Sequence, residues 1–343
     1  MCSSQPMKDR KHDLGSFPTT RMRRNRLKNF SRRLIKENQL NVDDLILPVF
    51  ITTGKNESQK ISSMPGVFRY SPDRLLKHLE IVSKLNIPAI ALFPHIDQGL
   101  KDSHGTEALK ENNLVCETVK MVKKEFPQLG VICDVALDPY TDHGHDGVLI
   151  DGEVDNDETV GILCKQALNQ ASAGCDVIAP SDMMDGRVLS IRETLDNNKF
   201  TNTQIMSYAA KYASSFYGPF RDAVGSSSGK KVIDKSSYQM SPENSDEAVR
   251  EVNLDISEGA DMVIIKPGMP YLDIIYRIKN ECNIPVFAYQ VSGEFSMISI
   301  SASSGALDLD KAMMESLLGF KRAGADGVLT YFAVEAATLL ANR

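Results

Sequence analysis

The chain has 343 residues, of which 42% are hydrophobic and 24% are charged, and its formal net charge at pH 7 is −6. This length fits one large domain or two ordinary ones, and it allows a substantial buried core. The acidic balance gives no reason to expect nucleic acid as a partner.

Six cysteines are scattered along the chain, without a CxxC pair or a spacing typical of a disulfide framework. This usage is typical of a reducing compartment. No apolar stretch approaches the roughly 20 residues that span a bilayer, and residues 1–15 lack the apolar core of a secretory signal. We therefore expect no membrane association and a cytoplasmic protein, or a plastid-type compartment if a leader has been removed.

The N-terminal segment is polar and locally basic. RMRRNRLKNFSRRLIKEN, residues 21–38, fits either an RNA-binding arm or a segment that faces an acidic protein surface. The second interpretation is favoured because the protein as a whole is acidic. We expect residues 1–35 to form an arm without a core of its own, and residues 36–343 to form the main domain.

Short apolar or β-rich runs recur along the rest of the chain and predict eight strands. They are DLILPVFI (44–51), PAIALFPHI (88–96), GVICDVALDPY (130–140), CDVIAPSDMM (175–184), QIMSYAAKY (204–212), DMVIIKPG (261–268), PVFAYQVSG (285–293) and DGVLTYFA (326–333). Segments with helical spacing of apolar residues lie between most of them, at 71–85, 112–126, 157–174, 241–259 and 307–324. Ser71 and Ser241 each precede a proline, which predicts two helix starts. Three glycines predict helix ends: Gly174, Gly259 and Gly324.

This alternation predicts a parallel sheet covered by helices. A count of eight favours closure into a (β/α)8 TIM barrel, preceded by the N-terminal extension arm. A doubly wound open sheet is the alternative. No GxGxxG loop follows any of the strands, so the usual dinucleotide fingerprint of that fold is missing.

In such a barrel, catalytic groups come from the carboxyl ends of the strands. The predicted strand ends and the loops after them deliver Asp134, Asp138, Ser181, Asp182, Lys211, Lys266, Ser292 and Tyr331. Pro267 disfavours helical backbone at Lys266, so we expect the sixth strand to end there with its ammonium group in the barrel mouth.

Lys211 and Lys266 end adjacent strands, which predicts a Schiff-base site. A single lysine at a barrel rim usually extends its ammonium group to water. Imine formation requires a neutral amine. A neighbouring cation lowers the pKa of a lysine and so increases its neutral fraction. A like charge ~4 Å away lowers a pKa by under one unit in water but by about three units at an effective dielectric of 20. We therefore expect the pair to be partly desolvated.

The segment YGPFRDAVGSSSGKKVIDKSSYQM, residues 217–240, is too rich in Gly and Ser to predict a packed element and is long for a connecting loop. It fits either a lid that closes Arg221 and Lys235 over an anionic substrate or a surface insertion. The pattern favours neither.

Several long motifs carry a family resemblance. They are CDVALDPYTDHGHDG (133–147), APSDMMDGR (179–187), MSYAAKYASSFYGPFRDA (206–223), MVIIKPGMPYLDII (262–275) and YQVSGEFSM (289–297). In this order they resemble the 5-aminolevulinate dehydratases, or porphobilinogen synthases, over nearly the whole chain. The resemblance implies a homo-octameric barrel lyase that condenses two 5-aminolevulinate molecules to porphobilinogen, with loss of two waters, in tetrapyrrole (haem and chlorophyll) biosynthesis.

The resemblance also implies residue roles. Lys266 matches the lysine that forms the Schiff base with the substrate supplying the propionate side, and Lys211 matches the second active-site lysine, which can hold the other substrate. Asp134, or another carboxylate at the barrel mouth, is a candidate for proton transfer. Seven positions match substrate-binding residues: Arg221, Lys235 and Gln239 for the carboxylate of the second substrate, Ser292 and Tyr331 for that of the first, and Tyr217 and Phe220, which could equally be core residues, for the pocket wall.

The expected metal chemistry follows from a departure from the family pattern. Members that use catalytic zinc place three cysteines where this chain has Ala136, Asp138 and Asp146, so we expect no zinc site of that type. We expect the two histidines between them to hold the loop. The cysteine-free subgroup commonly uses Mg²⁺, and Glu251 matches its allosteric, noncatalytic site, although a glutamate on an amphipathic helix is usually just solvated.

Other interpretations of the same pattern stay open. In the family, the N-terminal segment wraps a neighbouring subunit, which implies that residues 21–33 contact protein and support the octamer. A class I aldolase or another Schiff-base lyase would share one catalytic lysine but not the pair with its carboxylate-binding groups. A noncatalytic binding barrel would form no covalent adduct with 5-aminolevulinate.

Overall fold

The computed structural model describes residues 15–226 and 234–342. The chain forms two compact units, which span Met1–Gln39 and Leu40–Arg343. The predicted arm, residues 1–35, falls within the first unit. No helix in the described ranges is both long enough and apolar enough to cross a membrane.

The described part of the first unit contains two short helices, α1 (Arg24–Leu27) and α2 (Asn29–Leu34), neither of which buries a side chain. Helices this short are not stable through their own hydrogen bonds. Large apolar side chains are exposed along this segment: Phe17, Met22, Leu27, Phe30, Leu34 and Ile35. The described residues of the arm therefore have no core of their own.

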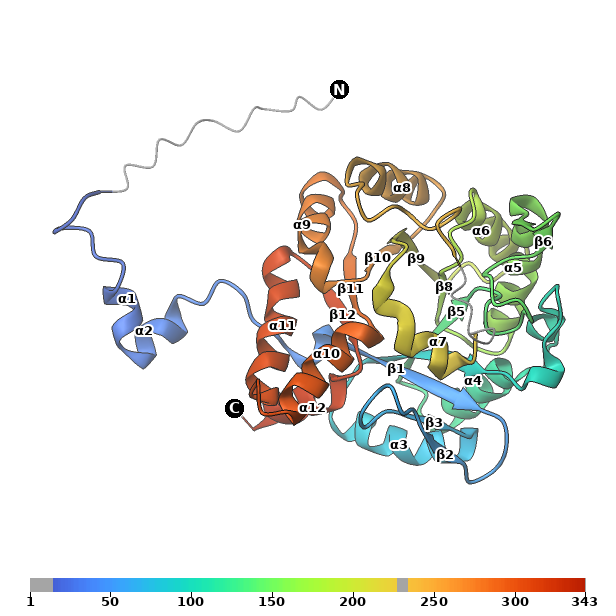
Figure 1. The fold of residues 1–343 in the computed structure, drawn as a ribbon, viewed down its shortest axis with the longest axis horizontal. Coiled ribbons are helices and arrows are strands. Elements are labelled where there is room, and N and C mark those ends of the chain that lie inside the picture. The colour runs from blue at the N-terminus through green and yellow to red at the C-terminus, as the bar shows by residue number, and fades with distance from the viewer. Residues whose placement is uncertain (1–14, 227–233, 343) are drawn as a thin grey trace. The chain divides into compact units, whose positions relative to one another are not determined.

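Eight parallel strands close into a barrel in the second unit (Figure 1). They are β1 (Leu45–Thr52), β4 (Ala89–His95), β5 (Gly130–Val135), β8 (Val177–Pro180), β9 (Gln204–Lys211), β10 (Met262–Lys266), β11 (Val286–Gln290) and β12 (Gly327–Thr330). The last strand pairs with the first through Leu45 opposite Val328 and Ile46 opposite Leu329. All eight predicted strands are confirmed, and the closing pair excludes an open sheet.

The helices of this unit lie mostly around the barrel (Figure 1). They are α3 (Pro72–Lys84), α4 (Leu114–Glu125), α5 (Asn156–Ser172), α6 (Arg187–Asn197), α7 (Gly218–Val224), α8 (Asp246–Ser257), α9 (Leu272–Glu281), α10 (Ser292–Ser303), α11 (Leu309–Ala323) and α12 (Ala333–Ala341). In the view of Figure 1, α7 lies in front of the strands. In α3, burial of Leu75, Leu79 and Val82 follows the helical spacing that predicted it. The five predicted helical segments are confirmed.

One of the two predicted helix starts is wrong. Pro72 is the first residue of α3, as predicted from Ser71. The start predicted at Ser241 fails because Met240 still pairs with Tyr212 as an isolated β-bridge. The chain then makes a turn and enters α8 only at Asp246.

The three glycines predicted to end helices have left-handed backbone conformations. Gly174, Gly259 and Gly324 have φ angles of 100°, 102° and 105° and follow α5, α8 and α11. A side chain would strain the backbone at these angles. The predicted helix ends are confirmed.

A hairpin that the sequence did not predict extends the sheet at the catalytic end of β1. It consists of β2 (Ser58–Lys60) and β3 (Phe68–Tyr70), which pair antiparallel. β3 also pairs with the end of β1, with Arg69 opposite Phe50. A second small hairpin, β6 (Leu149–Ile150) and β7 (Glu153–Val154), lies in the loop before α5.

The structure corrects the prediction that residues 217–240 contain no packed element. Residues Gly218–Val224 form helix α7, which buries Ala223 and Val224. Pro219 near the helix start and Gly225 at its end supply the signals that were outweighed by the Gly and Ser content of the segment. Residues 227–233, the centre of the segment interpreted as a lid or an insertion, lie outside the described residues.

Candidate active site

A polar pocket opens at the carboxyl ends of the barrel strands. We call it the lysine pocket, and its lining residues are Asp134, Asp138, Asp146, Ser181, Lys211, Tyr217, Phe220, Arg221, Lys235, Gln239 and Lys266. Eight of the predicted site residues are among them. The exceptions are Ser292, Tyr331 and Glu251.

The two predicted lysines are neighbours across the sheet. Lys211 ends β9 and Lys266 ends β10, and the two residues are paired in register, so both side chains leave the same face of the sheet. Each is only 5% exposed. The expectation of a desolvated pair is confirmed.

Lys266 lies in an aromatic cage. Its ammonium nitrogen is 4.9 to 5.2 Å from the centroids of four rings, those of Tyr208, Tyr217, Phe220 and Tyr289. Within residues 15–226 and 234–342, it forms no ion pair. Burial and the nearby charge of Lys211 lower the pKa of Lys266 to about 7, although Asp134 and other carboxylates oppose the shift. Roughly half of the amine is therefore neutral at pH 7.

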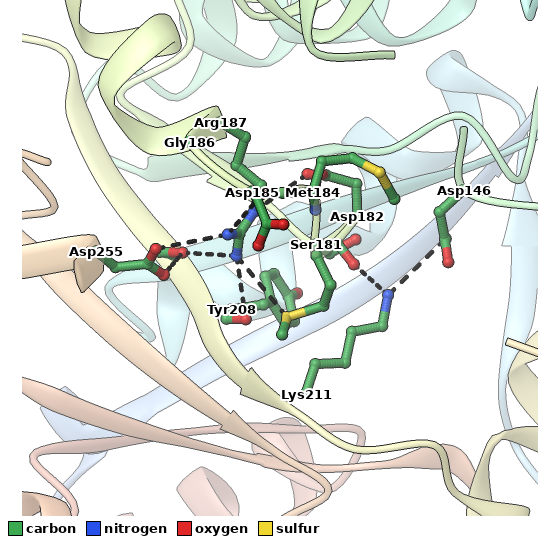
Figure 2. A network of polar contacts seen from close by, with 12 residues as sticks. Asp146, Ser181, Asp182, Met184, Asp185, Gly186, Arg187, Tyr208, Lys211 and Asp255 are labelled. Atoms are coloured by element: carbon green, nitrogen blue, oxygen red, sulfur yellow. Dashed lines mark hydrogen bonds and ion pairs between the residues drawn. The ribbon is translucent and has the colours of Figure 1, made fainter. Parts of the chain in front are cut away.

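Lys211 has a different environment (Figure 2). Its ammonium group donates a hydrogen bond to the carbonyl oxygen of Ser181 and lies 3.8 Å from a carboxylate oxygen of Asp146. A carbonyl and a carboxylate both stabilise the charged form of a lysine. The pair is thus asymmetric, with the counter-ion placed beside Lys211.

Asp146 connects Lys211 to Lys235. Lys235 donates a hydrogen bond of 3.2 Å to Asp146 and lies 3.6 Å from Asp138. Burial works against the ionised form of Asp146, but the two lysines prevail and lower its pKa to about 2. Burial likewise disfavours the Lys235 ammonium group, and the carboxylates of Asp146 and Asp138 reverse this and raise its pKa.

Asp134 provides a carboxyl group of the lysine pocket. Burial raises its pKa to about 7, against the influence of Lys266 and with support from Asp138. One of its oxygens is buried without a hydrogen-bond partner in the described part of the chain. A carboxyl group with a pKa near 7 can both accept and release a proton at neutral pH.

Three pocket residues come from α7 and the turn before it. The hydroxyl of Tyr217 donates to the carbonyl oxygens of Tyr212 and Lys266, at 2.8 and 3.1 Å, so its ring is fixed against the Lys266 side chain. Phe220 and Arg221 follow on α7 and complete this side of the pocket.

Ser292 and Tyr331 lie behind Phe220 and do not line the lysine pocket. The Ser292 hydroxyl accepts a hydrogen bond from the Phe220 amide at 2.9 Å. The Tyr331 ring stacks on Phe50, which in turn contacts Phe220, each with a centroid distance of 5.7 Å. Ser292 and Tyr331, which are both predicted to bind the carboxylate of the first substrate, are close to the pocket wall. The rings of Phe50 and Phe220 separate Tyr331 from the lysines.

A buried charge network that the sequence did not reveal supports the Ser181 loop (Figure 2). Arg187 is 2% exposed and lies 3.5 Å from carboxylate oxygens of both Asp182 and Asp255. It also donates to the carbonyl of Met184 at 3.2 Å. The motif APSDMMDGR marked this loop as chemically important, but the distant partner Asp255 carried no signal of its own.

His143 and His145 make contacts that hold the loop after β5, as expected. His143 lies 3.2 Å from the carbonyl oxygen of Ser103, and His145 lies 3.1 Å from the hydroxyl of Tyr238. The same hydroxyl accepts a hydrogen bond from the Asp146 amide. These contacts hold the loop that presents Asp146 to the lysines.

Glu251 lies on α8 and lines a separate, polar cavity of about 480 Å³. Burial, and then the neighbouring carboxylate of Asp255, raises its pKa, although Arg187 opposes the shift. No group of three or more His, Cys, Asp or Glu side chains in the described ranges is arranged to hold a metal ion. The residues fit a Mg²⁺ ion that keeps most of its waters, because such an ion needs only one or two carboxylates.

Comparison with known proteins gives the family. Residues 19–339 match the family model described as delta-aminolevulinic acid dehydratase. The chain belongs to this family. It is 60% identical over 322 residues to the delta-aminolevulinic acid dehydratase of Bradyrhizobium diazoefficiens, covering 93% of this chain and 90% of the relative. It is 49% identical to that of Rhodobacter capsulatus, covering 94% of this chain and 97% of the relative.

A solved structure of a family member is also similar. It is the delta-aminolevulinic acid dehydratase (porphobilinogen synthase) of Toxoplasma gondii ME49, in complex with the reaction product porphobilinogen. The TM-score is 0.92 at 45% sequence identity, and the match covers 94% of this chain and 92% of the other. The predicted resemblance and the TIM-barrel fold are confirmed.

Proposed function

We propose that this protein is a porphobilinogen synthase, a lyase that condenses two molecules of 5-aminolevulinate to porphobilinogen, with loss of two waters, in tetrapyrrole biosynthesis. Membership of the family supports this proposal. The observation that carries it is the register pair of buried lysines, of which Lys266 has a pKa of about 7.

Lys266 is the proposed attacking amine. Its neutral fraction adds to the ketone of one substrate, one water leaves, and a protonated imine forms. The protonated imine makes its carbon electrophilic. A proton leaves the carbon next to the ketone of the second substrate, and that carbon bonds to the imine carbon. The amino group of the first substrate then closes the ring on the ketone carbon of the second, whose oxygen leaves as the second water, and the Lys266 amine is eliminated to give the free product. Asp134 takes and returns the proton because its pKa is also near 7.

Lys211 has two proposed roles. In the resting pocket its ammonium group lies beside Asp146 and lowers the pKa of Lys266. When the second substrate enters, Lys211 holds it through its own amine once its proton has been transferred. Arg221, Lys235 and Gln239 line the pocket, which supports the proposal that they bind the carboxylate of that substrate.

Ser292 and Tyr331 are proposed to bind the carboxylate of the first substrate. Both lie behind Phe220, so the proposal includes that the Phe220 ring turns aside when substrate binds. The wall carrying Tyr217 and Phe220 then packs against the substrate chain.

Trapping with borohydride tests this function directly. The protein is incubated with 5-aminolevulinate, reduced and digested, and we expect the mass of the substrate adduct on the peptide that contains Lys266. The adduct should disappear in Lys266→Ala and persist in Lys279→Ala, a lysine that pairs with Asp326 outside the pocket. Absence of an adduct in the unaltered protein would favour a noncatalytic barrel.

A class I aldolase is the competing enzyme. It would also form an imine on one lysine, so trapping alone does not separate the two functions. Porphobilinogen gives a coloured adduct with an acidic aldehyde reagent, whereas aldol products do not. Formation of this colour from 5-aminolevulinate alone distinguishes the synthase.

We infer that Glu251 holds an allosteric Mg²⁺ ion and that the lysine pocket uses no catalytic zinc of the cysteine type. The carboxylates around the 480 Å³ cavity support the first inference. The second is supported by Ala136, Asp138 and Asp146 at the relevant positions, where Asp138 and Asp146 are engaged by Lys235. When bound, the ion would supply positive charge to this acidic cavity.

The arm is proposed to dock on another copy of the chain in a homo-octamer. The six exposed apolar side chains in residues 17–35 support this, because an isolated polar tail would not carry them. The basic residues between them suit an acidic surface such as this protein offers overall.

We also propose a cytoplasmic location. The described cysteines Cys116, Cys133, Cys164, Cys175 and Cys282 are all free thiols, which supports a reducing compartment. Mass spectrometry of alkylated protein from intact cells would reveal any disulfide.

A further inference from the structure

Helix α7 carries Phe220 and Arg221 into the lysine pocket, yet it is only seven residues long. A helix of two turns is not stable through its own hydrogen bonds. Its position must therefore be fixed from outside, and small shifts of its axis would move both side chains in the pocket.

Two cations outside the pocket bind the C-terminal end of α7. Arg69 donates to the carbonyl oxygens of Asp222 and Ala223, at 2.6 Å each. Lys101 donates to the carbonyl oxygen of Gly225, also at 2.6 Å. The last carbonyl groups of a helix have no partners within it, and positive charge stabilises this end of the helix dipole.

The β2–β3 hairpin is the element that brings Arg69 to this place. Pairing of Arg69 with Phe50 attaches the hairpin to the catalytic end of β1. The loop of the same hairpin adds a second link, because the Ser63 hydroxyl donates to the Asp222 carboxylate at 2.7 Å. The hairpin lies outside the closed eight-strand barrel. Its link to the pocket consists of these contacts with α7.

Both cations are partly withdrawn from water. Burial lowers the pKa of Arg69, with Asp222 opposing the shift, and burial likewise lowers that of Lys101, with Asp138 opposing it. A partly desolvated donor to a backbone carbonyl forms a stronger bond than an exposed one. The other end of α7 is held by the Ser292 hydroxyl, which accepts from the Phe220 amide.

We propose that Arg69 and Lys101 are positioning residues of the active site. They fix the C-terminal end of α7 and so hold Arg221 where it binds the carboxylate of the second substrate. Neither residue lines the lysine pocket, and their hydrogen bonds reach it through the helix. This inference rests on the proposed function and adds to it the residues that set substrate affinity from a distance.

Kinetics of Arg69→Met tests the proposal. We expect the KM for 5-aminolevulinate to rise about ten-fold, the factor that corresponds to 1.4 kcal/mol, with a smaller change in kcat. Lys101→Met should act in the same direction. Arg69→Lys should be intermediate, because a lysine keeps the charge but not the planar fork that serves two carbonyls.

Arg192→Met is the matched control. Arg192 also donates to two backbone carbonyls, those of Phe200 and Thr203, at 3.2 and 2.8 Å. These lie just before β9 begins, away from its catalytic end at Lys211. We expect Arg192→Met to lose stability without a change in KM.

Imine trapping separates failure of the inference from failure of the proposed function. All variants should still trap 5-aminolevulinate on Lys266, because that amine does not depend on α7 for its register. If the unaltered protein traps nothing, the proposed function fails. If it traps normally, the positioning role is overturned by an unchanged KM in Lys101→Met and Arg69→Lys, or by an equal rise in KM in Arg192→Met. If Arg69→Met does not fold, Lys101→Met and Arg69→Lys still test the proposal.

Discussion

Lys211 and Lys266 are register partners on adjacent strands, and after burial the charge of Lys211 is the main cause that lowers the pKa of Lys266 to about 7. The two lysines have different surroundings. Asp146 and the Ser181 carbonyl contact the ammonium group of Lys211, whereas Lys266 faces aromatic rings.

Removing the charge of Lys211 should move the pH profile of imine formation. In Lys211→Met the pKa of Lys266 rises, so less neutral amine is present at pH 7 and the midpoint of trapping shifts to higher pH by at least about one unit. The measurement is the rate of borohydride trapping on Lys266 between pH 5 and pH 10. Lys211→Arg keeps the charge and should leave the midpoint near 7; a midpoint that stays near 7 in Lys211→Met would refute the electrostatic role.

Asp146→Asn should destabilise the fold in a pH-dependent way. The change leaves Lys211 and Lys235 without their shared counter-ion, and breaking a buried ion pair costs about 3 kcal/mol. The pKa of Asp146 is lowered in the folded state, so its contribution is complete above the unfolded value of ~3.9 and is lost as the pH falls toward about 2.

Denaturant unfolding at several pH values measures this effect. The difference in unfolding free energy between the unaltered protein and Asp146→Asn should be largest at neutral pH and should shrink below about pH 4. Asp142→Asn, in the same loop but exposed, provides a control with little change. A constant difference across the pH range would mean that the loss is steric.

Glu251→Gln should abolish stimulation by Mg²⁺. The amide keeps the shape of the side chain but removes the negative charge that binds a hydrated ion. Calorimetric titration should show Mg²⁺ binding to the unaltered protein and none to the variant, and added Mg²⁺ should raise activity only in the former. Recovery of chelator-treated enzyme by zinc alone would contradict the proposed metal preference.

Deletion of residues 1–35 should reduce the size of the assembly. The deletion removes the exposed apolar side chains of the arm, from Phe17 to Ile35, without touching the barrel core. Light scattering coupled to size-exclusion chromatography measures the mass. An unchanged octamer would show that the arm is not required for assembly.

The sequence could predict the barrel and its lysine pair because both depend on local patterns. Each strand is a short apolar run, and a lysine before Pro267 marks a strand end at the catalytic face. The wrong helix start at Ser241 shows the limit of this reasoning, because a Ser-Pro signal was outweighed by the pairing of Met240 with Tyr212, which only the folded chain reveals.

The contacts that tune the lysines could not be predicted. Asp146 reaches Lys211 only because the loop that carries it folds back. The hydroxyl of Tyr238, which is distant in sequence from this loop, contacts His145 and the Asp146 amide and holds the loop there. The carbonyl of Ser181 leaves no signature in a sequence at all. Arg69 is equally hidden, since its partners on α7 lie more than 150 positions away.

Closure of the barrel has a consequence for biosynthesis of the protein itself. The seam between β1 and β12 pairs Leu45 with Val328, so one edge of β1 stays uncovered until β12, more than 280 positions later in the sequence, has been synthesised. A ribosome releases segments in order, and an uncovered strand edge is a site of aggregation during that interval. The nascent chain therefore depends on β12, Gly327–Thr330, to cover this edge and to close the barrel around the lysine pocket.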